Sequence, residues 1–200
     1  AGRPKGSGNV FKLLKNRSIA LGMASCGAFF MGQFALFTYV RPFLETVVRV
    51  DVSTLSPILL AIGLAGFIGT AIIGTVLKRG LYRTLISIPV LMAALALALI
   101  PFGTWIAPTT ALLALWGLMA TAAPVGWWNW IAEAMPRDAE AGGGLMVAVI
   151  QSAIALGSTV GGMSFDTHGY RSTFMLSAAV LLLAAFLAFL TARSLQRQPP

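Results

Sequence analysis

Residues 84–132 read TLISIPVLMAALALALIPFGTWIAPTTALLALWGLMATAAPVGWWNWIA, and none of these 49 residues is Asp, Glu, Lys or Arg. A helix needs about 20 apolar residues to cross the ~30 Å hydrocarbon core of a bilayer, so this run is long enough for two crossings. Its middle holds Pro101, Gly103 and Pro108, residue types that interrupt helices. The stretch therefore predicts two membrane-spanning helices joined by a turn.

Four further charge-free runs, 18–40, 52–77, 141–165 and 172–192, hold 21 to 26 residues each, enough for one crossing apiece. Strands of a membrane barrel would alternate polar and apolar residues, and this pattern is absent from the sequence. We expect an all-α integral membrane bundle over 18–193, with a cytoplasmic linker at 1–17 and a cytoplasmic tail at 194–200. The predicted spans are 19–41, 55–77, 84–101, 108–130, 143–164 and 173–192.

The composition and the distribution of charge support this class. The chain is 58% hydrophobic and 10% charged, whereas soluble domains carry roughly 25% charged residues. The net charge of +8 could suggest a nucleic-acid partner. Six spans place both termini on one side, however, and that side carries eleven Lys and Arg residues against three on the other. This bias is typical of cytoplasmic loops, so we expect both termini in the cytoplasm and no nucleic-acid partner.

Enzymatic and metal chemistry find no support in the residue types. Cys26 is the single cysteine and lies within a predicted span, so no disulfide framework is available. No Ser/His/Asp constellation, phosphate-binding loop or metal-ligand cluster occurs, and we expect no catalytic residue, metal or cofactor. The opening residues 1–9, AGRPKGSGN, have the composition of a flexible linker and lack an initial Met. We interpret them as an internal loop of a longer polypeptide.

Small residues recur in the second and fifth spans. Gly66, Thr70 and Gly74 form a stripe that favours close helix packing in lipid. We therefore expect the second and fifth spans in the packed interior and the sixth, rich in Leu, Ala and Phe, facing lipid. At an offset of 88, the second span echoes the fifth, with Gly69 over Gly157. This echo suggests two inverted three-helix repeats, an arrangement known from secondary transporters.

Several stretches resemble the C-terminal half of major facilitator superfamily transporters, most closely the bacterial purine-ribonucleoside and sugar efflux permeases. They are TYVRPFLE at 38–45, GWWNW at 126–130, AEAGG at 139–143, VAVIQ at 147–151, and Gly161-Gly162 with Asp166 and Gly169. The resemblance implies half of a twelve-span transporter in the bacterial inner membrane, partnered by six earlier helices of the same polypeptide. It further implies proton-coupled efflux of a small solute such as a nucleoside, sugar or drug, by alternating access.

The family's loop signature, Gly-x-x-x-Asp-Arg-x-Gly-Arg-Arg, would fall at residues 74–83. Arg79 and Arg83 match it, but Lys78 stands where the family has Asp. The resemblance implies gate roles for both arginines, which the departure at Lys78 puts in doubt. An external copy of the signature keeps Asp166 and Arg171, which become gate candidates, although a simple charged turn with Ser172 or Thr173 capping the next helix is the alternative.

The resemblance also implies that the first and fourth helices of the half line a central cavity. Phe30, Gln33 and Phe37 share one face of the first span with Cys26, which suits a ring-bearing solute. Other candidates for solute binding are Trp127, Asn129 and Gln151. For Gln33 and Gln151 the alternative is an interhelical hydrogen bond, and for the tryptophans it is a membrane-interface belt.

Arg41 ends the first span, one turn before Glu45. We expect a gate charge paired with Glu45, and the alternative is an arginine that reaches for lipid headgroups. For the whole chain, the alternative function is a self-sufficient six-span protein, acting as a homodimeric transporter or as a structural subunit of a membrane complex. A channel is a further alternative class, and it would require rings of charged side chains or of carbonyl groups.

Overall fold

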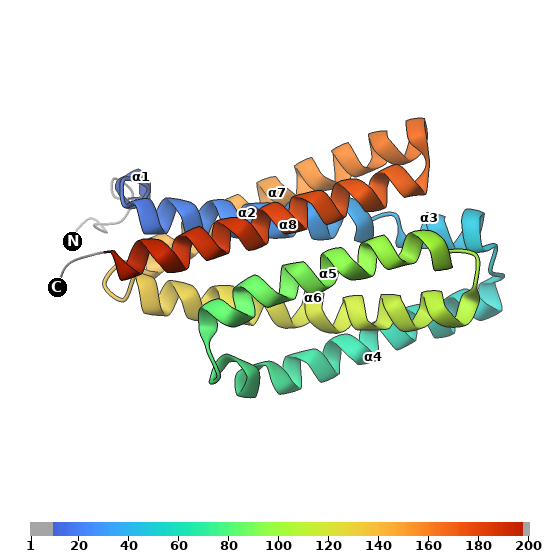
Figure 1. The fold of residues 1–200 in the computed structure, drawn as a ribbon, viewed down its shortest axis with the longest axis horizontal. Helices are drawn as coiled ribbons and strands as arrows, with labels where there is room; N and C mark the ends of the chain where they lie inside the picture. Colours follow the sequence, from blue (N-terminus) through green and yellow to red (C-terminus); the bar gives the residue numbers. More distant parts are fainter. Residues whose placement is uncertain (1–9, 198–200) are drawn as a thin grey trace, which may run out of the picture.

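The computed structural model describes residues 10–197, and over that range it is built of helices joined by short turns (Figure 1). Six helices in this range are long and apolar enough to cross a membrane, which confirms the predicted fold class. They are α2 (Arg17–Phe37), α4 (Val52–Leu77), α5 (Leu81–Phe102), α6 (Ile106–Ala134), α7 (Ala139–His168) and α8 (Tyr170–Gln196). Shorter elements are α1 (Val10–Leu13), α3 (Val40–Phe43) and the π-helical turn η1 (Leu44–Val48).

The break inside the long charge-free run is shorter than the prediction. Only residues 103–105 separate α5 from α6, because Pro101 is accommodated in the last turn of α5. Pro108 is the third residue of α6, in the first turn, where a helix has no amide hydrogen bond to lose. The two prolines therefore predicted the position of the turn correctly, but both belong to the helices and not to the turn itself.

The first span departs from a single helix. α2 begins at Arg17, inside the segment expected to be a linker, because the Asn16 side chain accepts a hydrogen bond of 3.0 Å from the Ser18 amide. It ends at Phe37, and the chain continues through α3 and η1 to Arg49, which has a left-handed φ of 60°. Residues 1–9 of the predicted linker and 198–200 of the predicted tail lie outside the described residues.

Two of the turns between long helices depend on glycine. Gly80, between α4 and α5, has a φ of 149°, and Gly169, between α7 and α8, has a φ of 81°. Residues other than glycine rarely adopt these φ angles. The expectation that Ser172 or Thr173 caps the last helix is wrong, since α8 already begins at Tyr170 and the Thr173 hydroxyl donates instead to the Gly161 carbonyl at 3.1 Å.

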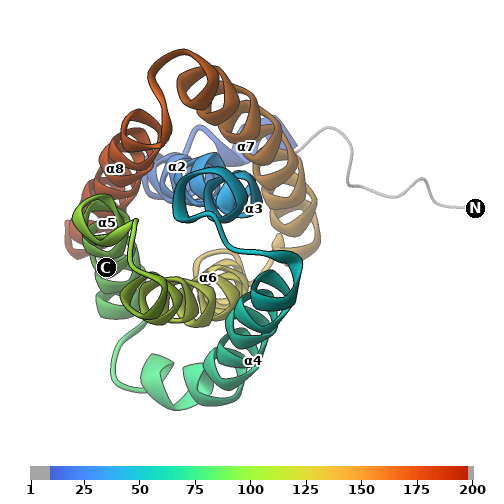
Figure 2. The same cartoon turned by 90° about the vertical axis from the view of Figure 1, so that its right-hand side faces the viewer.

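The helices pair in a repeated way. α2 packs on α7 and α8, α6 packs on α4 and α5, and α5 joins the two groups through α8 (Figures 1 and 2). If α2, α4 and α5 are matched in order with α6, α7 and α8, the α2–α7 pair corresponds to the α6–α4 pair. Two inverted three-helix units produce this correspondence.

The glycines show which faces make these pairs. Gly69 of α4 lies directly against the Leu118 carbonyl of α6, and Gly157 of α7 lies directly against the Met31 carbonyl of α2. Gly74, by contrast, has no neighbour that a Cβ would meet. The face of α4 that contacts α6 therefore runs through Gly66 and Gly69. The predicted stripe is correct at Gly66 but wrong at Thr70 and Gly74, which are exposed.

The expected interior placement of the second and fifth spans is also wrong within this chain. In the most apolar stretch of α2, 67% of the residues are buried, against 28% in α4 and 17% in α7. On each of these two helices, the glycines that contact another helix lie on one side, and the remaining face is uncovered. The expectation that the sixth span is the more exposed one is wrong as well, since 44% of the most apolar stretch of α8 is buried, although Leu182, Leu183 and Phe186 are exposed on one side.

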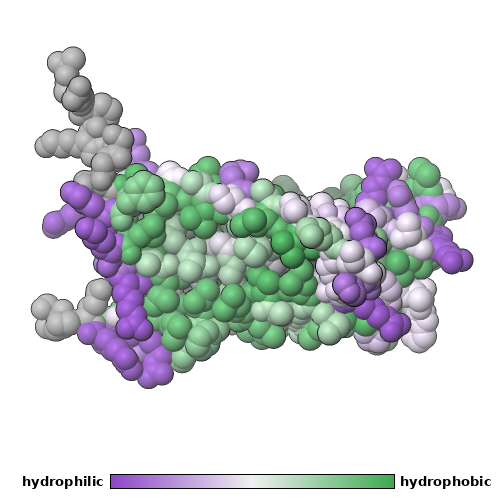
Figure 3. Space-filling model, turned by 90° about the horizontal axis from the view of Figure 1, so that it is seen from above, coloured by the Kyte–Doolittle hydropathy of each residue, from purple (hydrophilic) through white to green (hydrophobic). Residues whose placement is uncertain are grey.

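The surface has the polarity of a membrane protein. On the face shown in Figure 3, the middle of the bundle is apolar and hydrophilic residues gather at both ends. α1 and the end of α8 lie at the same end (Figure 1), where the hydroxyls of Ser18 and Ser194 are 2.7 Å apart. The start of the first long helix and the end of the last one therefore lie on the same side of the bundle, as an even number of crossings requires.

Candidate functional site

Gln33 is the most unusual polar residue in the interior. It is 8% exposed, and its Oε1 atom is buried without a hydrogen-bond partner among the described residues. It lies about 24 Å along α2 from Arg17, at 1.5 Å per residue, and therefore deep in the apolar middle of the bundle. An unpaired buried amide oxygen costs about 1–3 kcal/mol. The structure therefore places a free hydrogen-bond acceptor at membrane depth.

The aromatic residues predicted beside Gln33 divide between the interior and the surface. Phe30 is buried and stacks on Phe34 with ring centroids 6.5 Å apart. Phe37 is 41% exposed and meets the same Phe34 ring edge-on at 6.2 Å. Phe30, Phe34 and Phe37 thus form a continuous row of contacting aromatic rings along α2, from the core to the surface.

One buried polar group lies outside the predicted set of solute-binding residues. Trp116 of α6 is fully buried, and its Nε1 atom has no partner within the part of the chain that the structure describes. It lies about 27 Å along α6 from Ala134, a depth comparable to that of Gln33. A buried indole normally finds an acceptor. No local signal distinguishes Trp116 from a packing tryptophan, because its neighbours on the helix are apolar.

The candidates at the end of α6 do not gather into one site. Trp127 is buried and packs edge-on against Trp130 at 5.7 Å, which indicates a packing role. Trp128 and Asn129 are exposed on another side of the helix. The structure thus separates Trp127 from Asn129 and places neither with Gln33.

Gln151 lies on the uncovered face of α7. It is exposed, as are its neighbours Ala148 and Ala155, one turn away on either side. It is about 18 Å from the start of the helix at Ala139. Small residues therefore flank Gln151, and no other helix among the described residues covers this face.

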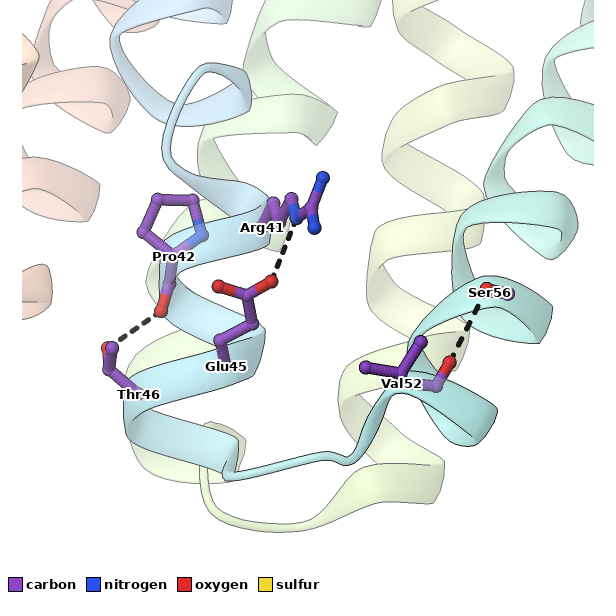
Figure 4. Close-up of polar contacts among 6 residues, drawn as sticks. All are labelled: Arg41, Pro42, Glu45, Thr46, Val52 and Ser56. Atoms are coloured by element: carbon purple, nitrogen blue, oxygen red, sulfur yellow. Dashed lines mark hydrogen bonds and ion pairs between the residues drawn. The ribbon is translucent and has the colours of Figure 1, made fainter.

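Arg41 and Glu45 form the ion pair that was expected at the external end. Arg41 Nε lies 2.8 Å from Glu45 Oε1, one helical turn away (Figure 4). In the next turn the Thr46 hydroxyl donates to the Pro42 carbonyl at 2.6 Å, also drawn in Figure 4. The two charged side chains are 68% and 44% exposed, and such surface pairs contribute roughly 0–1 kcal/mol. The pairing is confirmed, and the gate role stays a prediction.

The other gate candidates lie at opposite ends of the bundle. Arg79 and Arg83 flank the α4–α5 turn, whereas Asp166 and Arg171 flank the α7–α8 turn at the other end (Figure 1). Arg41–Glu45 is the ion pair found within residues 10–197, so none of these four forms one there. Arg171 instead lies against the Tyr170 ring, 5.9 Å from its centroid.

No group of three metal-ligating side chains occurs among the residues described. Six apolar helices with hydrophilic ends define an integral membrane protein. Among the described residues, the buried side-chain polar atoms that lack a hydrogen-bond partner lie on α2 and α6, which hold corresponding positions in the two three-helix units.

Curated proteins similar to this chain include two kinds of bacterial protein. One, from Pseudomonas aeruginosa, is named transcription regulatory protein OpdE, and is 60% identical over 96% of this chain and 48% of its own length. Proteins named purine ribonucleoside efflux pump NepI, from Salmonella paratyphi C and Salmonella typhimurium, are 40% identical over 88% of this chain and 45% of their own length. The chain spans about half the length of the curated relatives it matches. No family model matches it.

Proposed function

We propose that this chain is the C-terminal six-helix half of a twelve-span major facilitator transporter. The transporter would export a small polar or aromatic solute, such as a nucleoside, sugar or drug, across the bacterial inner membrane by alternating access. Six earlier helices of the same polypeptide form the other half, and both ends of this half face the cytoplasm. The efflux-pump names of the 40% identical relatives support this reading, as does the match to about half of their length.

The observation that carries the proposal is the uncovered face of α7. An amide such as that of Gln151 costs several kcal/mol in hydrocarbon when it is unpaired, yet Gln151 is exposed in the middle of a membrane-spanning helix. Its polar neighbour Ser152 is exposed as well, beside a shallow hollow of about 340 Å³ between α2 and α7. Such a face belongs against protein or a water-filled path, and a second six-helix half would supply both.

Energy for export is expected from proton entry. The acidic residues of this chain lie in turns or near helix ends, as do Glu45, Asp51 and Asp166. A proton relay needs ionisable groups inside the membrane, so this half would line the solute path and the other half would carry the relay. Gln33, with its free acceptor oxygen, and Gln151 are the proposed solute contacts in this half.

The test compares the full-length polypeptide with residues 1–200 alone. Everted membrane vesicles from cells that express each form are assayed for uptake of radiolabelled purine ribonucleosides, sugars and a panel of antibiotics, with and without a protonophore. Protonophore-sensitive uptake by the full-length form, and none by residues 1–200, is expected. Transport by residues 1–200 alone would instead support the self-sufficient homodimer and overturn the half-transporter.

The name of the 60% identical relative suggests a second role, in transcription regulation. An exporter can change transcription indirectly, by lowering the cytoplasmic concentration of a solute that a separate regulator senses. Transcript profiles of cells that express the wild type and a transport-impaired Gln33 or Gln151 variant distinguish the two roles. Equal transcriptional effects from both would favour regulation that is independent of transport.

A further inference from the structure

A groove opens between α4 and α5 at the end where their connecting turn lies. The two helices are adjacent in sequence but barely touch, because each packs on α6 instead. The groove has a volume of about 290 Å³, and Ile73 and Ile88 form part of its floor with residues of α6. Ile72, Val76 and Leu91 line it from α4 and α5 and are 40–48% exposed. The groove is therefore apolar along its length and open to its surroundings.

The end of the groove is basic. Arg79 and Arg83 both line it, on either side of the α4–α5 turn. The aliphatic part of Arg83 folds back over Gly80, with Cδ 3.3 Å from the position that a Cβ would take there. Both arginines are exposed, and neither forms an ion pair within the described part of the chain. Two uncompensated positive charges thus lie at the mouth of an apolar groove.

Backbone groups add to this positive potential. α5 starts immediately after Gly80, and no side chain caps its first turn. The free amides of a helix N-terminus carry a partial positive charge and favour anions. The start of α5 therefore reinforces the two arginines at the same place.

We propose that this groove binds an anionic phospholipid, with its phosphate between Arg79 and Arg83 and an acyl chain along Ile72, Val76 and Leu91. The charge complementarity selects an anionic head, and the apolar walls select a hydrocarbon tail. The arginines lie on the side with the excess of basic residues, which is the expected cytoplasmic side. Anionic lipids are abundant in that leaflet, and basic pockets between transmembrane helices bind their headgroups. The proposal requires a membrane-embedded chain but no particular transported solute.

The test measures lipid binding directly and does not use transport. The full-length protein is purified in neutral detergent, and retention of phosphatidylglycerol and phosphatidylcholine is titrated by native mass spectrometry. The double variant R79Q/R83Q should bind phosphatidylglycerol roughly 30-fold more weakly, equivalent to about 1 kcal/mol for each arginine. The matched control Arg137→Gln removes another arginine of the same side, in the α6–α7 turn, and should change binding little.

A second pair of variants tests the apolar groove without altering charge. Ser87 lines the groove and is exposed, so Ser87→Phe should fill it and weaken phosphatidylglycerol binding at least fivefold. Thr75→Phe adds the same ring to an exposed position of α4 that does not line the groove, and should have no effect. Melting temperatures of all variants in detergent report on folding.

Four results would overturn the proposal. They are absence of phosphatidylglycerol binding to the unsubstituted protein, equal binding of phosphatidylcholine, equal losses in R79Q/R83Q and Arg137→Gln, and displacement by millimolar glycerol 3-phosphate. The first is expected if a helix of the other half or of a second copy fills the groove. The last would mean that the arginines bind a free phosphate and that the apolar walls contribute nothing.

Discussion

Gly69 of α4 lies directly against the backbone carbonyl of Leu118 in α6, and a Cβ at this position would also lie 2.9 Å from the Leu118 carbonyl carbon. Gly157 of α7, 88 residues later, has the same relationship to Met31 of α2. Backbone atoms cannot move aside as the end of a flexible side chain can. Close contacts of this kind replace hydrophobic burial as the force that holds helices together in lipid.

Substitutions at these glycines should therefore separate the helix pairs. Gly69→Ala and Gly157→Ala should each destabilise the protein by about 1–3 kcal/mol, because the added methyl group overpacks a helix crossing. Gly74→Ala is the matched control, since no atom of another helix among the described residues lies within 4 Å of its Cβ position, and it should be neutral or stabilising. Thermal unfolding in detergent measures the difference. Equal melting temperatures for the Gly69 and Gly74 variants would contradict the close packing of Gly69 on α6.

The membrane orientation can be tested with the same protein. Arg49 and His168 are exposed at one end of the bundle, and Arg79 and Arg137 at the other. Single cysteines at 49 and 168, in a Cys26→Ala background, should react with an impermeant maleimide added to intact cells. Cysteines at 79 and 137 should react only after the cells are opened. The reverse pattern would place both termini outside the cytoplasm.

Replacement of the buried Gln33 by an apolar residue should not lower the melting temperature, unlike most substitutions in a protein interior. Its oxygen has no partner among the described residues, so Gln33→Met should leave the melting temperature unchanged or raise it, because removal of an unpaired buried polar group costs nothing. Export should nevertheless fall if the amide binds solute. A clear fall in melting temperature would show instead that Gln33 is paired in the full-length protein and has a structural role.

Gln151 should behave differently, because it is exposed in the structure of this chain. Gln151→Ala should weaken the apparent affinity for solute by about 5–30-fold, the loss of roughly 1–2 kcal/mol for hydrogen bonds to a bound ligand, with normal membrane expression. Thr159→Val, on the same uncovered face, removes a hydroxyl that bonds Ala155 of its own helix at 2.8 Å and serves as the control. Unchanged affinity with a lower melting temperature would assign Gln151 to contact between the halves.

Asp51 makes the start of α4 sensitive to acid. Its carboxylate accepts hydrogen bonds from the Thr54 amide at 2.9 Å and the Ser53 hydroxyl at 3.0 Å. Bonds from Thr54 and Ser53 lower the pKa of Asp51 below its ordinary value of 3.8. A lowered pKa in the folded state adds stability at neutral pH, and this stability is lost as the pH falls below about 4. Asp51→Asn keeps an acceptor without titrating, so its melting temperature should depend less on pH between 5 and 2 than that of the wild type; an identical dependence would exclude Asp51 as a source.

The charge-free runs alone determined the number and type of the membrane helices. An ionised side chain is costly in hydrocarbon, so the spacing of Lys, Arg, Asp and Glu marks where the chain can cross. The Arg41–Glu45 pair was likewise predictable, because residues four apart lie on the same side of one helix turn. Both are local properties, and they hold whichever helices later become neighbours.

Only the tertiary structure decided what each helix face meets. In sequence Gly69 and Gly74 look alike, and so do Gln33 and Gln151, yet one of each pair is packed against a neighbouring helix and the other is exposed. The groove beside Arg79 likewise depends on α4 and α5 both packing on α6. In lipid every helix face is apolar, so hydrophobic periodicity, which reveals the buried face of a soluble helix, carries little information. The fit of small residues against a neighbouring backbone decides the pairing, and that fit exists only once the helices are assembled.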